Sequence, residues 1–330
     1  MTTVPSIKLS SGYTMPVVGF GIWKVPRENT ADAVYNAIKL GYRHIDGAYD
    51  YCNSAEAGEG VRRAIKDGLV KREDLFITSK LWNNYHRREH ALAMAKSEVA
   101  EWGLEYLDLY LIHFPISLQY IPPSEIKWPC FWTDPERTKR TPLDPVPIAE
   151  TWAALESLAR TSENPTGIFK SIGVANFHTQ LLYDMLGYAK IRPAVLQVEH
   201  HPYLTQKHLI DMAQENGITV TAYSSFGPQS YLEMGSGRAA AATSLFENPV
   251  IKAISKKHGR TPAQVLLRWA TQRNIIVIPK SNSSERLAQN LESTSFDLTE
   301  EEITKISGLD IGLRLNDQAD LSPPIRIHTV

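Results

Sequence analysis

Four polar residues stand where a buried apolar strand would be expected to end. Asp46 and Lys80 each close an apolar run, His113 closes a third, and Tyr51 follows five residues after Asp46. An apolar residue would be the ordinary occupant at each of these positions. If the three runs are neighbouring parallel strands, their carboxyl ends meet at one edge of the sheet, so we expect the four side chains to form one cluster.

These residue types suit proton donation to a carbonyl oxygen. A tyrosine phenol titrates at about 10 in water, and we expect the Lys80 ammonium to lower that pKa while Asp46 keeps the lysine charged. A neutral His113 can donate a hydrogen bond to the same oxygen. None of these groups is a reductant and no metal-ligand spacing is present, so the pattern predicts an organic hydride donor and no metal ion.

Eight apolar runs of strand length alternate with helical patterns along the chain. Thr261 followed by Pro262, for example, is typical of a helix start. Eight strand–helix units predict a (β/α)8 TIM barrel that forms one domain over residues 1–330, with an open doubly wound sheet as the alternative. Segments 7–9 and 15–20 predict an N-terminal β-hairpin before it. The eight runs are residues 17–23, 42–46, 75–82, 107–113, 169–177, 194–200, 219–225 and 275–280.

Two intervals between strands are much longer than the others. They follow strand 4 (107–113) and strand 7 (219–225), so both predicted loops lie on the face that carries the active site in such barrels. The first loop, 115–147, is rich in proline and also contains Trp128, Phe131 and Trp132. This composition favours a loop folded over an apolar pocket rather than a flexible linker.

Composition limits the partners that we expect. Lys+Arg number 35 against 36 Asp+Glu, a net charge of −1, which argues against nucleic acid as a partner. No apolar run reaches the roughly 20 residues of a membrane helix, and the first residues lack the pattern of a signal peptide. Two cysteines, Cys52 and Cys130, cannot form a disulfide scaffold. We therefore expect a cytoplasmic protein, a monomer or homodimer, that acts on a small molecule.

One basic pair is typical of a binding site, whereas two motifs that resemble binding sites lack the surrounding sequence that such sites require. Lys280 and Arg286 flank a serine-rich helix start at 281–284, which is typical of an anion site. Gly235-Ser-Gly-Arg-Ala-Ala240 matches a dinucleotide-binding pattern but follows no strand, so we interpret it as a mobile loop. His200-His201 lacks a third ligand at suitable spacing, so we expect a structural role.

Longer motifs resemble the aldo-keto reductase superfamily and, within it, the fungal xylose (aldose) and L-arabinose reductases. The matching stretches are 19–23, 42–51, 107–115, 197–202 and 278–282, and the resemblance covers essentially the whole chain. It implies a (β/α)8 barrel that reduces aldehydes with NADPH, preferred here, or NADH. It also implies that Asp46, Tyr51, Lys80 and His113 form the family's catalytic tetrad.

The resemblance further assigns a cofactor site. It implies that Tyr223 stacks on the nicotinamide, that Asn176 and Gln197 bind its carboxamide, and that Glu233 binds ribose hydroxyls when NADH is used. The remaining residues are implied to contact the pyrophosphate (Ser224, Phe226 and Gln229), the 2′-phosphate (Lys280, Ser281, Asn282 and Arg286) and the adenine (Gln289 and Asn290).

The expected substrate is the open-chain aldehyde of D-xylose or L-arabinose, which would be reduced to the polyol. Asp50 and Asn316 form a polar pair shared with xylose reductases, and His113 would orient the carbonyl. A reductase of glyceraldehyde or a uronic acid, with Arg137, Lys139 or Arg140 as an additional cation, is one alternative. A non-catalytic NADPH-sensing subunit is another. The expected apolar walls are Trp23, Trp82, Phe114, Trp128 and Phe131.

Three positions depart from the family pattern. Cys52-Asn53-Ser54 follows the tyrosine where the family usually has a glutamate after the asparagine. Ala175 replaces a serine before Asn176, and the loop 160–167 is longer than usual. The first two changes are expected to weaken activity or cofactor binding modestly, and the third is expected to lie away from the chemistry.

Overall fold

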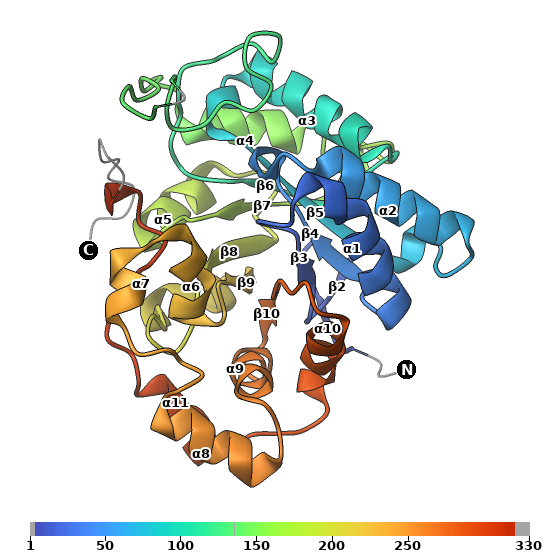
Figure 1. The fold of residues 1–330 in the computed structure, drawn as a ribbon. Helices are drawn as coiled ribbons and strands as arrows, with labels where there is room; N and C mark the ends of the chain where they lie inside the picture. The colour runs from blue at the N-terminus through green and yellow to red at the C-terminus, as the bar shows by residue number, and fades with distance from the viewer. Residues whose placement is uncertain (1–3, 135, 321–330) are drawn as a thin grey trace.

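The computed structural model describes residues 4–134 and 136–320. Its centre is a sheet of eight parallel strands in the order β3 to β10, and each strand pairs with the next along the chain. A bridge between Val18 and Val277 joins the first strand to the last, with Gly19 N donating to Val277 O at 2.8 Å. The predicted (β/α)8 fold is confirmed (Figure 1). The strands are β3 (Phe20–Gly21), β4 (His44–Asp46), β5 (Phe76–Leu81), β6 (Leu107–Ile112), β7 (Phe169–Ala175), β8 (Val195–Glu199), β9 (Thr219–Tyr223) and β10 (Ile275–Val277).

The predicted N-terminal hairpin is present as β1 (Ser6–Lys8) and β2 (Thr14–Pro16), which pair antiparallel. Gly12 lies between them with a φ of +90°, a conformation that favours glycine. Leu9 and Met15 of the hairpin pack in one apolar cluster with Leu109 and Ile276 of the barrel strands. The hairpin therefore closes one end of the barrel, away from the carboxyl ends of the strands.

Helices surround the strands in Figure 1. Local signals in the sequence set several of their ends: Thr261 caps α9 and exchanges hydrogen bonds with Gln264, and Gly41 ends α1 in the left-handed region. The helices are α1 (Arg27–Leu40), α2 (Ser54–Lys66), α3 (Arg88–Trp102), α4 (Ile148–Glu156), α5 (Thr179–Tyr188), α6 (Lys207–Glu215), α7 (Gly237–Ala241), α8 (Pro249–His258), α9 (Pro262–Thr271), α10 (Ser284–Leu291) and α11 (Glu300–Ser307).

The two long loops follow β6 and β9, as predicted. The segment expected to be a mobile loop around residue 235 instead contains the short helix α7. Ser236 caps that helix by accepting a hydrogen bond from Ala239 N, and three alanines continue it. In the part of the chain that the structure describes, no helix is both long enough and apolar enough to cross a membrane.

Candidate active site

The four predicted catalytic side chains gather at the carboxyl ends of neighbouring strands. Asp46 is the last residue of β4, Lys80 lies one residue before the end of β5, and His113 directly follows β6. Tyr51 ends a short 3-10 turn, Tyr49–Tyr51, just beyond β4. The strand register thus brings together groups that lie up to 67 residues apart in sequence (113 − 46).

A buried ion pair forms the floor of the cluster. Lys80 Nζ lies 2.7 Å from Asp46 Oδ1, and the two side chains are 0% and 1% exposed. The ammonium also donates to Gly47 O at 2.7 Å and to the Tyr51 hydroxyl at 3.2 Å. The other carboxylate oxygen of Asp46 accepts a hydrogen bond from Gln197 Nε2 at 2.8 Å. All three ammonium protons of Lys80 therefore have hydrogen-bond acceptors, and one of these acceptors is the Tyr51 hydroxyl oxygen.

The pKa of Tyr51 differs from the sequence expectation. Desolvation in the cleft raises the pKa of the phenol well above its ordinary value of 10, and the negative charges of Asp46 and Asp50 act in the same direction. The net shift of this pKa is opposite to the lowering that we expected from Lys80, because desolvation and the neighbouring carboxylates outweigh the ammonium. The phenol therefore keeps its proton at neutral pH and is available as a proton donor.

His113 lies between the tyrosine and an aromatic wall. Its ring centroid is 5.9 Å from that of Tyr51, 5.4 Å from Trp82 and 4.9 Å from Phe114. Its Nδ1 is 3.0 Å from Asp50 Oδ1, in an orientation that does not satisfy hydrogen-bond geometry. The imidazole is thus fixed mainly by ring contacts, next to a carboxylate that also faces the cleft.

A cleft of about 1610 Å³ opens above the cluster. Binding sites for a single small molecule usually measure roughly 300–1,000 Å³, so this one has room for two bound molecules or one long one. Lys80 lies beneath its floor. The predicted site residues that line the cleft are Trp23, Asp46, Asp50, Tyr51, Trp82, His113, Phe114, Phe131, Asn176, Gln197, Tyr223, Ser224, Phe226, Gln229, Glu233, Lys280, Ser281, Asn282, Arg286, Gln289, Asn290 and Asn316.

Trp128 is the predicted wall residue that lies elsewhere. Its ring packs beneath the cations of Arg27 and Lys127, each 4.8 Å from the ring centroid. It lines a small separate hollow beside Tyr49 and Cys52 rather than the cleft. The cation contacts hold the indole on the outer side of the loop, and Trp132 lines the cleft in addition to the predicted Phe131.

The tyrosine of β9 is held from two sides. The Tyr223 hydroxyl donates to Asn176 Oδ1 at 2.6 Å and accepts from Asn316 Nδ2 at 2.9 Å. Asn176 Nδ2 in turn donates to the backbone oxygen of His113 at 2.8 Å. A chain of hydrogen bonds therefore crosses the mouth of the barrel, and sequence inspection did not predict it.

The far end of the cleft carries unpaired positive charge. Lys280 and Arg286 lie beside the N-terminus of α10, and neither forms an ion pair with any residue of the described ranges. Arg286 Nε donates to Ser281 Oγ at 3.3 Å, and Ser283 caps the helix. Two free cations at a helix N-terminus make this end suitable for a phosphate.

Lys24 is a cleft residue that sequence inspection missed. Its ammonium lies 2.5 Å from Glu233 Oε1 and donates to Ser230 O, which links the loop after β3 to the loop after β9. The ion pair lowers the pKa of the Glu233 carboxyl. The carboxylate expected to face a ribose is therefore already paired. No local signal could reveal this contact, because the partners lie more than 200 residues apart.

The adjacent histidines after β8 have structural partners, as expected. The His200 ring stacks on Trp269 with centroids 4.7 Å apart. His201 Nε2 lies within hydrogen-bond distance of Glu199 Oε1, at 2.8 Å.

Comparison with known sequences decides the family. Residues 17–311 match the profile of the Aldo/keto reductase family. The chain belongs to this family. It is 66% identical over 322 residues to a NAD(P)H-dependent pentose reductase of Pyricularia oryzae, covering 98% of each chain. It is 56% identical over 323 residues to a probable NAD(P)H-dependent D-xylose reductase of Emericella nidulans, covering 98% of this chain and 99% of the relative. It is 55% identical over 315 residues to a NAD(P)H-dependent D-xylose reductase of Aspergillus niger, covering 95% and 96%.

The cleft of this aldo/keto reductase fits a nicotinamide dinucleotide. Its unpaired cations at α10 suit a phosphate, and the anchored ring of Tyr223 offers a flat face near Tyr51 and His113. The Gln197 amide still has its oxygen free to accept, while both polar ends of Asn176 are already engaged within the chain. Each amide oxygen has two lone pairs and each NH2 group two protons, so Gln197 and Asn176 both keep sites for the expected carboxamide.

One departure of this aldo/keto reductase from its family has a compensating neighbour. Ser54 donates to Oε1 of Glu98, a fully buried glutamate of α3, at 2.7 Å. The same oxygen accepts from Ser79 at 2.6 Å and from Trp102 Nε1 at 3.0 Å. A carboxylate is thus still present between the segment that carries Tyr51 and the strand that carries Lys80, although it comes from a different helix.

Proposed function

We propose that this protein is an NAD(P)H-dependent aldose reductase that converts the open-chain aldehydes of D-xylose and L-arabinose to their polyols. The observation that carries the proposal is the buried Lys80–Asp46 pair beneath the Tyr51 hydroxyl, next to His113, on the floor of a cleft large enough for a dinucleotide and a sugar. The pentose and D-xylose reductases among its relatives support the choice of substrate.

His113, Tyr51 and Lys80 have different roles in the reduction of the carbonyl. A bound reduced nicotinamide supplies the hydride. His113 orients the carbonyl oxygen by a hydrogen bond, and Tyr51 Oη gives its proton to that oxygen as negative charge develops there. Lys80 keeps the phenol in place through its hydrogen bond to Oη. Because the pKa of the phenol is raised, the proton leaves only when the oxygen has become a stronger base than phenolate.

The cleft is suited to a small polar substrate. Asp50 and Asn316 present polar groups to it. The Asn316 amide already donates to Tyr223 and accepts from Gln318, whereas Asp50 Oδ1 has no hydrogen-bond partner among the described residues, so a purely apolar aldehyde would leave this oxygen unpaired at a cost in affinity. The surrounding wall is largely aromatic and offers apolar faces to the carbon skeleton of a substrate. Its aromatic members are Trp23, Trp82, Phe114, Phe131 and Trp132.

The cations at α10 are the basis for preferring NADPH. Lys280 and Arg286 would pair with the 2′-phosphate, and Ser281, with Asn282 beside it, would add hydrogen bonds. NADH lacks this phosphate, and Glu233 could then accept from the ribose hydroxyls through Oε2 while Oε1 keeps its bond to Lys24. Both cofactors are therefore proposed to bind, NADPH more tightly.

A uronic acid is the second candidate substrate, because one basic residue of the first long loop faces the cleft. Arg137 lines it, whereas Lys139 and Arg140 do not. A carboxylate at the far end of the sugar would pair with this guanidinium. Glyceraldehyde remains an alternative as a shorter polar carbonyl substrate.

Steady-state kinetics with purified protein test these proposals. D-xylose, L-arabinose, D-galacturonate and glyceraldehyde are each compared with NADPH and NADH. The proposal is supported if the two pentoses with NADPH give the highest kcat/KM. A higher kcat/KM for galacturonate would mean that a uronic acid, not a pentose, is the substrate. Binding of NADPH without turnover of any aldehyde would favour the cofactor-sensing role. A single domain, a cytoplasmic location and a monomeric or homodimeric state remain further proposals.

A further inference from the structure

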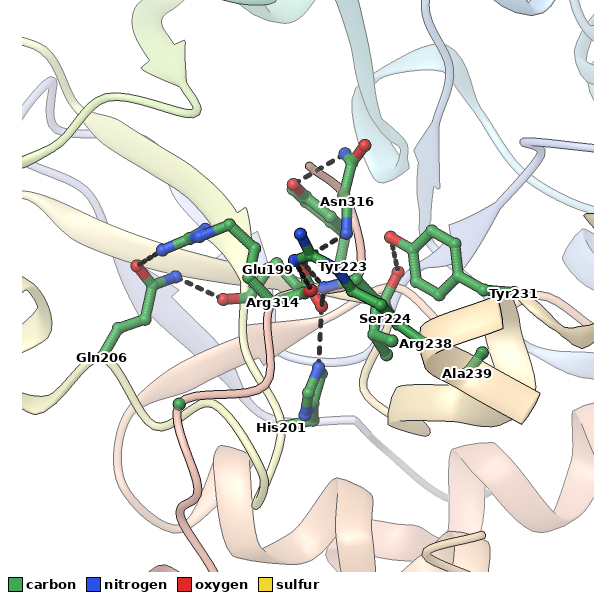
Figure 2. Close-up of polar contacts among 12 residues, drawn as sticks. Glu199, His201, Gln206, Tyr223, Ser224, Tyr231, Arg238, Ala239, Arg314 and Asn316 are labelled. Carbon is green, nitrogen blue, oxygen red and sulfur yellow. Dashed lines mark hydrogen bonds and ion pairs between the residues drawn. The ribbon is translucent and has the colours of Figure 1, made fainter. Parts of the chain in front are cut away.

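A buried carboxylate at the end of β8 has no part in the chemistry described above. Glu199 is 0% exposed. Its oxygens accept from His201 Nε2 at 2.8 Å, from Leu315 N at 3.0 Å and from Asn316 N at 2.8 Å (Figure 2). Burying a charge is costly unless donors surround it, and two of the donors here are backbone groups of a distant segment. We call that segment, residues 309–320, the C-terminal arm.

A second contact ties the arm to the same place. Gln206 Nε2 donates to the backbone oxygen of Glu199 at 2.5 Å, and Arg314 donates to Gln206 Oε1 at 2.9 Å. Three successive residues of the arm, Arg314 to Asn316, are therefore anchored to Glu199 directly or through Gln206. Figure 2 shows these contacts converging on the end of β8.

The arm continues into the chain of hydrogen bonds across the barrel mouth. Asn316, whose backbone N–H is held by Glu199, uses its side chain to donate to the Tyr223 hydroxyl. Tyr223 then reaches Asn176, which donates to the backbone of His113. A displacement of Asn316 therefore removes one of the two hydrogen bonds that hold the Tyr223 ring.

The arm also contacts the loop after β9, but more weakly. Arg238 of α7 pairs with Asp320 at 2.7 Å and with Asp317 at 3.5 Å, and its side chain is 43% exposed. Exposed ion pairs contribute little to stability because water and salt screen them. The buried carboxylate is the stronger anchor of the two.

We propose that Glu199 is a positioning residue that fixes Leu315 and Asn316 of the C-terminal arm and, through Asn316, sets the place of the Tyr223 ring and of the polar group offered to the sugar. Glu199 itself does not line the cleft. This inference rests on the proposed function in one respect, which is that the substrate is a sugar. A glutamine at position 199 has one oxygen in place of two and turns an amide towards backbone N–H donors, so at least one donor loses its partner.

Hydrogen exchange of the backbone amides tests the anchor without any substrate. In full-length Glu199→Gln, exchange of the Leu315 and Asn316 amides should become about tenfold to a hundredfold faster, while the barrel strands, and the Leu313 amide that donates to Tyr203, keep their protection. Glu98→Gln is the matched control, since it alters another fully buried glutamate with three donors far from the arm. Unchanged exchange of the Leu315 and Asn316 amides in Glu199→Gln, or equal acceleration of these amides in Glu98→Gln, would overturn the proposal.

A double-mutant cycle tests whether Glu199 acts through Asn316. Glu199→Gln should raise the KM for D-xylose about tenfold or more and change kcat less, and Asn316→Ala should do the same. The double variant should resemble Asn316→Ala alone. Additive effects, or a loss of kcat with unchanged KM, would contradict the proposal. If the wild-type protein reduces no aldose, the proposed function fails, while the exchange measurement still decides the role of Glu199.

Discussion

The buried pair of Lys80 and Asp46 allows a prediction whose size follows from the structure. Lys80→Met replaces the ammonium by an apolar chain of similar length and removes three hydrogen bonds, to Asp46 Oδ1, Gly47 O and Tyr51 Oη. The two charged side chains are at most 1% exposed, so the lysine is the main group that neutralises the buried Asp46 carboxylate. Asp46 keeps only the Gln197 amide as a partner.

An unpaired buried charge destabilises a protein by about 3–5 kcal/mol. With an unfolding entropy of about 2.1 cal/mol/K per residue, a chain of 330 residues has about 0.7 kcal/mol/K, so the melting temperature should fall by about 4–7 °C. Asp46→Asn combined with Lys80→Met removes both charges. This double variant should recover more than half of the lost stability, because no buried charge then lacks its partner.

Thermal melts followed by circular dichroism at about pH 7 measure both variants against the wild type. In the same preparations, both variants should lose most of their reductase activity, because the Tyr51 hydroxyl has lost the group that holds it. The reasoning is refuted if Lys80→Met melts at the wild-type temperature. It is equally refuted if the double variant is less stable than Lys80→Met alone.

Two further variants probe the charged groups. In a fluorescence titration, Arg286→Ala should lower the affinity for NADPH about tenfold or more and leave the affinity for NADH nearly unchanged. Equal losses of affinity for both cofactors would mean that Arg286 does not contact the 2′-phosphate. Burial raises the pKa of Glu98 above 4.5 although three donors oppose the shift, so its contribution to stability is present below the unfolded-state pKa and is lost as pH rises through the folded-state pKa. Glu98→Gln keeps the acceptor oxygen and should flatten this fall in thermal melts recorded upward from about pH 4.5. An unaltered pH profile would contradict the assignment.

The barrel could be predicted because its strands carry their own signal. Runs such as Ile275–Val277 are apolar on both faces, and the polar residues Asp46, Lys80 and His113 interrupt that pattern at the strand ends. The parallel register then brings those ends together whatever the loops do. Local capping signals such as Thr261 before α9 were reliable for the same reason, since the interaction is confined to a few residues.

Features that depend on distant partners could not be predicted. The ion pair of Lys24 with Glu233, and the contact of Glu199 with the C-terminal arm, join segments that only the folded chain brings together. Trp128 was misplaced because its contacts with Arg27 and Lys127 lie outside the cleft, and the spacing of residues in the loop does not reveal them. The pKa of Tyr51 was given the wrong direction because desolvation depends on how deeply the phenol lies, which its sequence neighbours do not reveal.

The most direct test of the account is the single-turnover rate of NADPH oxidation with saturating D-xylose, compared between the wild type and Tyr51→Phe. The phenylalanine keeps the ring contact with His113 and removes only the proton donor. We predict a rate lower by about a hundredfold to ten-thousandfold, the usual contribution of a general acid, with unchanged affinity for NADPH. A variant that reduces D-xylose within about tenfold of the wild-type rate would contradict the assignment of Tyr51 as the proton donor.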